Sequence, residues 1–111
     1  MPNPKQSERV PVSAWKSFER RVAKYIGGGA ERVPITGRQR GSEPDISHPW
    51  LSIECKYRKA TPEWIKDAMR QAFASKKRPN DLPVVIIGEK GDHTGNAWVI
   101  VSLEDFRDRW L

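Results

Sequence analysis

Cysteine and histidine are scarce in this chain, which has one cysteine and two histidines among 111 residues. A single cysteine, Cys55, excludes an internal disulfide framework. With His48 and His93 as its only companions, a zinc site built from cysteine and histidine is disfavoured. The chain also lacks an apolar run long enough to cross a membrane and a segment resembling a secretory signal. We therefore expect a cytoplasmic protein with no membrane partner.

Acidic residues are too few to balance the basic ones. Lysine and arginine number 20 against 14 aspartates and glutamates, so the formal net charge is +6. This excess favours polyanionic partners, although many basic proteins bind nucleic acid only nonspecifically. The length predicts one domain with a modest core, over residues 13–111. The proline-rich segment before it, residues 1–12, is expected to be a flexible basic arm.

Hydrophobic periodicity and breaker residues predict three helices and five strands in the order α-β-β-β-α-β-β-α. Ser13, Thr61 and Ser102 are the expected N-caps, with Pro62 in the first turn of the second helix. We expect an α/β fold in which a central mixed five-stranded sheet is flanked by helices. The predicted elements are helices over 13–26, 61–77 and from 102 onward, and strands within 30–35, 44–47, 51–57, 82–90 and 97–102.

Three charged residues stand out in the segment "EPDISHPWLSIECKYR", which otherwise resembles two strands. Alternation along the second strand puts Glu54 and Lys56 on one face, with α-carbons roughly 6.6 Å apart. An antiparallel turn would bring Asp45 beside Glu54. The alternative is an exposed Glu-Lys pair at a sheet edge.

Glu19 borders the apolar stripe of the first predicted helix. It is either a glutamate at the margin of the core or a third carboxylate directed toward Asp45 and Glu54. Three neighbouring carboxylates repel one another, and a divalent cation such as Mg²⁺ resolves that conflict. Such a site hydrolyses phosphodiesters, with Lys56 holding the attacking water or neutralising the charge that develops on the phosphate.

The succession of Glu19, "PD" at 44–45 and "ECK" at 54–56 resembles the motif of the PD-(D/E)XK nucleases. Within that superfamily the chain is most similar to the archaeal-type Holliday junction resolvases, the Hjc family, which also occur in viruses and phages. The similarity extends to "SAWKSFERRVAKYI", "PITGRQRGSEPDI" and "MRQAFASKK". The resemblance implies a restriction-endonuclease-like core. It also implies a metal-dependent endonuclease of DNA recombination and repair.

The resemblance assigns roles to particular residues. Asp45, Glu54 and the main-chain carbonyl of Cys55 would bind Mg²⁺, and Glu19 would bind the ion directly or through water. Mn²⁺ would be able to substitute for Mg²⁺. Lys56 would be the catalytic lysine. Gln71 would orient the water or Lys56, or is simply a polar residue on a helix surface. The implied partners are a four-way DNA junction and a second copy of the chain, with no small-molecule substrate.

Further basic and polar residues are candidates for DNA contacts. They lie in the arm, in the loop before Asp45 and after the catalytic strand: Lys5, Arg9, Thr36, Arg38, Arg40, Arg58 and Lys59. No aromatic platform for single strands is predicted, and the five tryptophans are expected in cores or interfaces. Another PD-(D/E)XK repair or restriction-type nuclease is the alternative enzyme. A noncatalytic DNA-binding module is the rival class, but it has no need for three acids facing a polyanion.

A homodimer is expected because two symmetric cuts need two sites. The runs "VVII" and "WVIV" at 84–87 and 98–101 predict strands covered on both faces, and the final helix is too short to cover them all. The leftover apolar surface either forms the dimer interface or completes the core of one chain.

Overall fold

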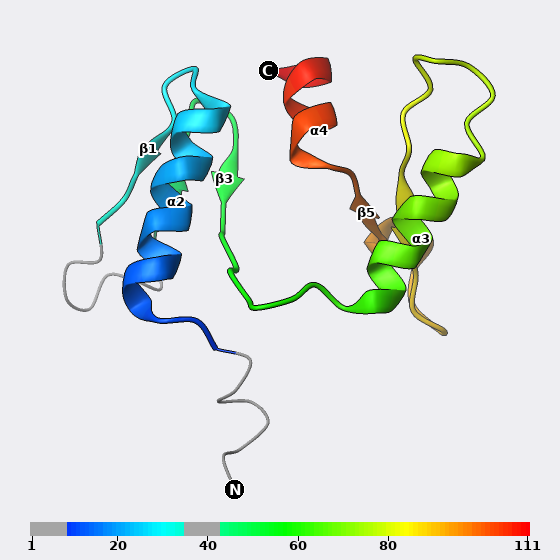
Figure 1. The fold of residues 1–111 in the computed structure, drawn as a ribbon, viewed down its shortest axis with the longest axis horizontal. Helices are drawn as coiled ribbons and strands as arrows, with labels where there is room; N and C mark the ends of the chain where they lie inside the picture. Colours follow the sequence, from blue (N-terminus) through cyan, green and yellow to red (C-terminus); the bar gives the residue numbers. More distant parts are fainter. Residues whose placement is uncertain (1–8, 35–42) are drawn as a thin grey trace, which may run out of the picture. The chain divides into compact units, whose positions relative to one another are not determined.

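A computed structural model describes residues 9–34 and 43–111, which form two compact units that meet in sequence between Ala60 and Thr61. The predicted order of helices and strands is confirmed, with one short 3-10 helix added (Figure 1). A single domain over 13–111 stays a prediction. The elements are α2 (Val12–Ile26), β1 (Glu31–Arg32), β2 (Ile46–Ser47), β3 (Ser52–Ile53), α3 (Glu63–Ala74), β4 (Val85–Ile87), η2 (Thr94–Asn96), β5 (Trp98–Ile100) and α4 (Leu103–Trp110).

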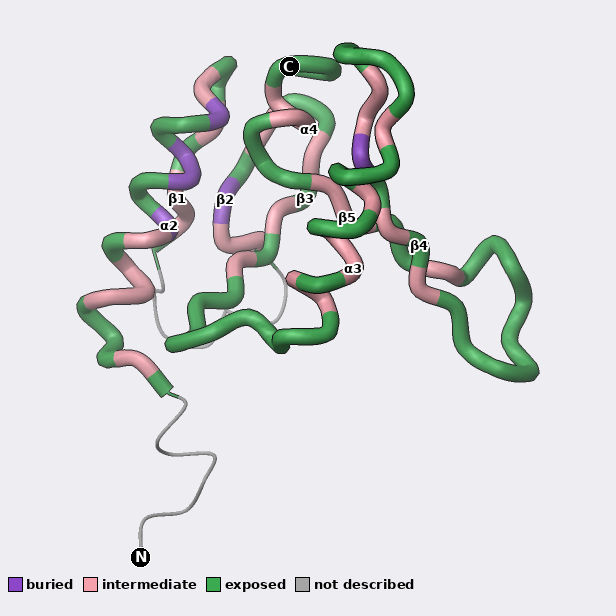
Figure 2. The backbone as a smooth tube through the Cα atoms, turned by 45° about the vertical axis from the view of Figure 1, so that its right-hand side comes forward, coloured by how far each residue is buried: buried purple, intermediate pink, exposed green. Residues whose placement is uncertain are grey.

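The first unit packs α2 against an antiparallel sheet in the order β1-β2-β3. Its core comprises Val22, Ala23 and Ile26 from α2 together with Ile46 from β2, and Figure 2 shows these buried stretches on the helix and the strand. The helix ends at Gly27, whose φ of 64° is readily adopted only by glycine. Val22 and Ile26 of the apolar stripe predicted for this helix lie in the core and Phe18 packs against it, whereas Tyr25 is 37% exposed.

The second unit contains α3, the hairpin of β4 and β5, and α4. One face of the β4–β5 hairpin includes Ile86 and Val99, which pair directly across the two strands. Both side chains are largely exposed, at 66% and 63% of their full accessible area. Helix α3 contacts β4. This unit thus leaves apolar strand surface open to solvent.

One of the three predicted helix caps is confirmed. Ser102 caps α4, and its hydroxyl accepts the N–H of Asp105 at 3.1 Å. The other two predictions were wrong by one or two residues, because α2 begins after Pro11 and α3 after Pro62. A proline can occupy these positions because it has no N–H to satisfy at a helix start.

The prediction of a central mixed five-stranded sheet is wrong for the described part of the chain. The five strands form one sheet of three and one of two, and every pairing is antiparallel. The ladders are only two or three residue pairs long. Beyond Ile53 the N–H of Cys55 donates a hydrogen bond to the carboxylate of Asp45. This main-chain N–H is therefore not available to a carbonyl of a neighbouring strand. None of the helices in the described segments has the length and hydropathy that a bilayer crossing requires.

Candidate active site

A cleft of about 160 Å³ lies in the first unit, where α2 faces the residues before β2 and after β3. Its lining combines acidic and basic side chains with aromatic ones. The cleft is lined by Trp15, Phe18, Glu19, Asp45, Cys55, Lys56 and Tyr57.

The backbone after β3 explains how three consecutive residues reach the same cleft. In a regular strand, neighbours point to opposite faces, and the sequence predicted a strand over 51–57. The strand instead ends at Ile53, and the following backbone is irregular. Cys55, Lys56 and Tyr57 can therefore all line one surface.

Asp45 is anchored by main-chain groups on both sides. Its Oδ2 accepts the N–H of Cys55 at 2.8 Å, and its carbonyl oxygen accepts the N–H of Val33 at 2.8 Å. Since Ile46 pairs with Ile53, Asp45 and Glu54 are the next positions along the two antiparallel chains. The predicted neighbourhood of Asp45 and Glu54 thus follows from the strand register.

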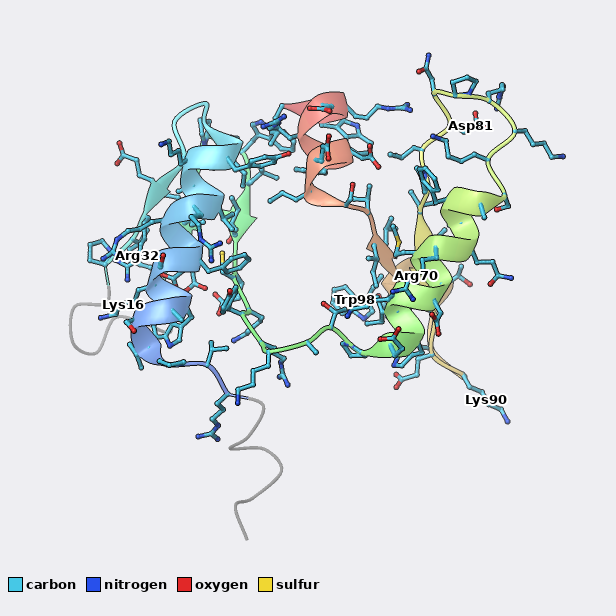
Figure 3. The ribbon with its side chains drawn as sticks, viewed as in Figure 1. Lys16, Arg32, Arg70, Asp81, Lys90 and Trp98 are labelled. Atoms are coloured by element: carbon cyan, nitrogen blue, oxygen red, sulfur yellow. The ribbon has the colours of Figure 1, made fainter. Side chains whose placement is uncertain are left out.

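Glu19 is the buried carboxylate of the cleft, with 3% of its area exposed. Its Oε2 accepts a 2.7 Å hydrogen bond from Nε of Arg32, whose side chain is itself mostly buried. Figure 3 labels Arg32 beside α2. Sequence reasoning missed Arg32, although a carboxylate at the margin of the core signals that a cationic partner must come from elsewhere in the fold.

Glu54 and Lys56 form an ion pair with Nζ and Oε1 3.4 Å apart. Both side chains are more than half exposed, and only Lys56 lines the cleft. An exposed pair of this kind was the alternative that the sequence left open. Such surface pairs contribute little to stability, so either side chain can leave the pair at small cost when a ligand arrives.

All three carboxylates raise the pKa of the Cys55 thiol. Its pKa is raised to about 11, first by burial and then by the negative charges of Asp45, Glu19 and Glu54. The thiol is therefore protonated at neutral pH and is a poor nucleophile. The shift also indicates that the three predicted carboxylates act on one small region of the first unit.

The donors of this region fit Mg²⁺ in chemistry, since carboxylate and carbonyl oxygens are its preferred protein ligands. Among the described residues, Asp45 has no cationic side-chain partner, whereas Glu19 and Glu54 each have one. Within the same residues, no three acidic, histidine or cysteine side chains are arranged as a ready metal site. The metal-ligand set stays a prediction.

The remaining predicted residues fall into three groups. Lys5, Thr36, Arg38 and Arg40 lie outside the described residues. Arg9 and Arg58, both exposed, are joined by an antiparallel backbone bridge, and Lys59 follows, also exposed. Arg9 therefore lies beside the segment that follows the cleft. Gln71 is an exposed residue of α3 in the second unit, where its predicted role is untested.

The cleft combines groups suited to a cation, to an anion and to an apolar surface. Asp45 offers a carboxylate for a cation, Lys56 offers an ammonium for a phosphate, and the aromatic side chains offer an apolar surface. Comparison with protein-family models, with curated proteins and with solved structures gives no match.

Proposed function

We propose that the chain is a Mg²⁺-dependent DNA endonuclease. The observation that carries the proposal is the cleft, in which Glu19, Asp45 and Lys56 converge from separate segments of the first unit. Together with Glu54, these residues resemble the PD-(D/E)XK motif in their order along the sequence. A noncatalytic DNA-binding module is disfavoured because acidic side chains in a binding cleft repel the phosphate backbone unless a cation lies between them.

The proposed roles follow from the chemistry of each group. Asp45, Glu54 and the carbonyl of Cys55 would hold Mg²⁺ or Mn²⁺, with Glu19 in direct contact or behind a water. The bound ion would supply a hydroxide nucleophile at neutral pH and stabilise charge on the phosphate. Lys56 keeps its ammonium at the mouth of the cleft, since its side chain is 73% exposed. It is therefore able to reach a phosphate oxygen or hold a water.

The substrate we propose is a four-way DNA junction. The net charge of +6 and the adjacent cations Arg9 and Arg58 favour a nucleic-acid backbone. The preference for a junction comes from the resemblance to the Hjc-type resolvases, and another PD-(D/E)XK nuclease is the alternative. Cleavage of matched four-way, duplex and single-stranded substrates, each with Mg²⁺ and with EDTA, distinguishes the two. A resolvase cuts the junction in paired, symmetric positions and leaves the duplex intact.

We also propose that the active form is a homodimer. The supporting observation is the exposed apolar pair of Ile86 and Val99 on the β4–β5 hairpin, since surface of this kind marks interfaces. The alternative is that this surface completes the core of a single chain. Sedimentation equilibrium at micromolar concentration is expected to give twice the chain mass. The double variant Ile86→Ser/Val99→Thr is expected to shift the protein to monomers while keeping its helical circular dichroism. A wild-type protein that sediments as a monomer contradicts the dimer.

A further inference from the structure

The aromatic side chains that line the cleft have no role in the proposed hydrolysis. Trp15 and Phe18 come from α2, and Tyr57 comes from the irregular segment after β3. The rings of Phe18 and Tyr57 lie 4.6 Å apart between centroids, tilted by 36°. Tyr57 keeps 36% of its area exposed although it lines the cleft. Part of its surface is therefore accessible to a ligand.

Two neighbouring side chains hold the ring of Tyr57. Phe18 packs against the core of the first unit, and the guanidinium of Arg21 lies over both rings, 5.6 Å from Phe18 and 5.7 Å from Tyr57. A cation over an aromatic face is attracted by the ring and restrains it. The Tyr57 ring is thus held in place before any ligand binds, which lowers the entropy cost of binding against it.

Size and polarity restrict what can occupy this surface. The cleft, at about 160 Å³, has room for one flat ring, so the rest of a larger ligand would extend into solvent. A flat ring attached to a phosphate suits a space that is lined both by aromatic side chains and by the cation Lys56. A nucleotide has this composition, and every nucleobase has a face that stacks on an aromatic ring.

A base within a continuous duplex already stacks on both neighbours, so it must leave the stack before it can lie on a side chain. That step costs least where the base is unpaired or next to a break in stacking. We propose that Tyr57, backed by Phe18, is a stacking subsite for one unstacked nucleobase of the DNA strand at the cleft. This inference rests on the proposed function for the identity of the strand, and it adds a physical reason for preferring branched or unpaired DNA.

The adjoining sequence fits this role. Lys56 and Arg58 flank Tyr57, so a cation lies on either side of the stacking ring along the chain. Cations interleaved with an aromatic residue are the pattern by which proteins follow a single strand, with bases stacked and phosphates neutralised.

The test is a binding measurement that needs no cleavage. A single-stranded oligonucleotide containing one 2-aminopurine is titrated with the protein in the presence of Ca²⁺, which takes oxygen ligands as Mg²⁺ does, and its fluorescence and affinity are recorded. Stacking is expected to quench the fluorescence. Tyr57→Leu is expected to lose the quenching and weaken binding about 5- to 150-fold, which corresponds to about 1–3 kcal/mol. Tyr57→Phe, which keeps the ring, is expected to behave like the wild type.

Tyr25→Leu is the matched control. Tyr25 is also a tyrosine of the first unit and is exposed to nearly the same extent, 37%, but it does not line the cleft. The proposal is overturned if wild-type protein does not quench the probe, if Tyr57→Leu binds and quenches like wild type, or if Tyr25→Leu loses as much. Cleavage is read separately. If only Tyr57→Leu loses the quenching, the subsite is supported even when the protein cleaves no DNA. If the protein cleaves DNA but Tyr57→Leu quenches like wild type, the proposed nuclease function is supported and the subsite is not.

Discussion

Arg32 on β1 donates a 2.7 Å hydrogen bond to the buried carboxylate of Glu19 on α2. The pair joins the sheet to the helix beside the cleft. A carboxylate that is 3% exposed would be costly without this partner, because little water reaches it. Glu19 can therefore be held in position by Arg32 whether or not a metal ion is bound.

The first prediction concerns the stability of this pair. Arg32→Ala leaves the buried Glu19 charge without a partner and is expected to lower the free energy of unfolding by about 3–5 kcal/mol in urea denaturation. Adding Glu19→Gln to that variant removes the stranded charge and is expected to recover part of the loss. Arg70→Ala is the control, since Arg70 pairs with Glu63 and Asp67 at the exposed surface and its loss should cost far less. If Arg32→Ala and Arg70→Ala lower the free energy of unfolding equally, the Arg32–Glu19 pair contributes no more to stability than a surface ion pair.

A second prediction concerns the reactivity of Cys55. Its pKa of about 11, against an ordinary value of 9.0, leaves about one-hundredth of the usual thiolate near neutral pH. Alkylation by iodoacetamide is therefore expected to be about 100-fold slower in the folded protein than in urea. Asp45→Asn removes one of the charges that raise the pKa, so it is expected to lower the pKa and speed the reaction. A rate in folded Asp45→Asn no faster than in the wild type would argue that Asp45 does not act on the thiol.

Salt dependence tests the third prediction, which concerns Arg9 and Arg58. Their backbone bridge brings two cations to one place beside the cleft segment. If each contacts one phosphate, the double variant Arg9→Ala/Arg58→Ala reduces the slope of log affinity against log salt by about two. Lys90→Ala, an exposed cation after β4, is the control and should leave the slope nearly unchanged. An unaltered slope in the double variant removes these two residues from the DNA interface.

Local signals in the sequence were sufficient for the element order and for part of the site. The stripe on α2 and the glycines after it predict the helix and its end, and Ser102 predicts the start of α4. Asp45, Cys55 and Lys56 were found because they belong to one short segment. Strand register places Asp45 opposite Glu54, and the end of β3 at Ile53 lets Cys55 and Lys56 line the same cleft.

Contacts between distant segments were harder to predict. The partnership of Arg32 with Glu19 depends on how α2 packs on β1, which no local pattern encodes. The position of Tyr57 in the cleft depends on β3 ending at Ile53, because a continued strand would have put Tyr57 and Lys56 on opposite faces. The prediction of a five-stranded sheet was wrong for a related reason, because the alternation of apolar residues identifies strands but does not specify which strands pair.

Cleavage of DNA by wild type and by two cleft variants tests the central claim most directly. Purified protein is incubated with a labelled four-way junction and Mg²⁺, alongside Asp45→Asn, Lys56→Ala and the control Glu31→Gln, whose carboxylate is exposed on β1. We predict paired cuts by wild type and Glu31→Gln, and a loss of at least about 100-fold in both cleft variants, which should still fold and bind the junction. Cleavage at the wild-type rate by Asp45→Asn and Lys56→Ala, or no Mg²⁺-dependent cleavage of any DNA by folded wild-type protein, would contradict the account.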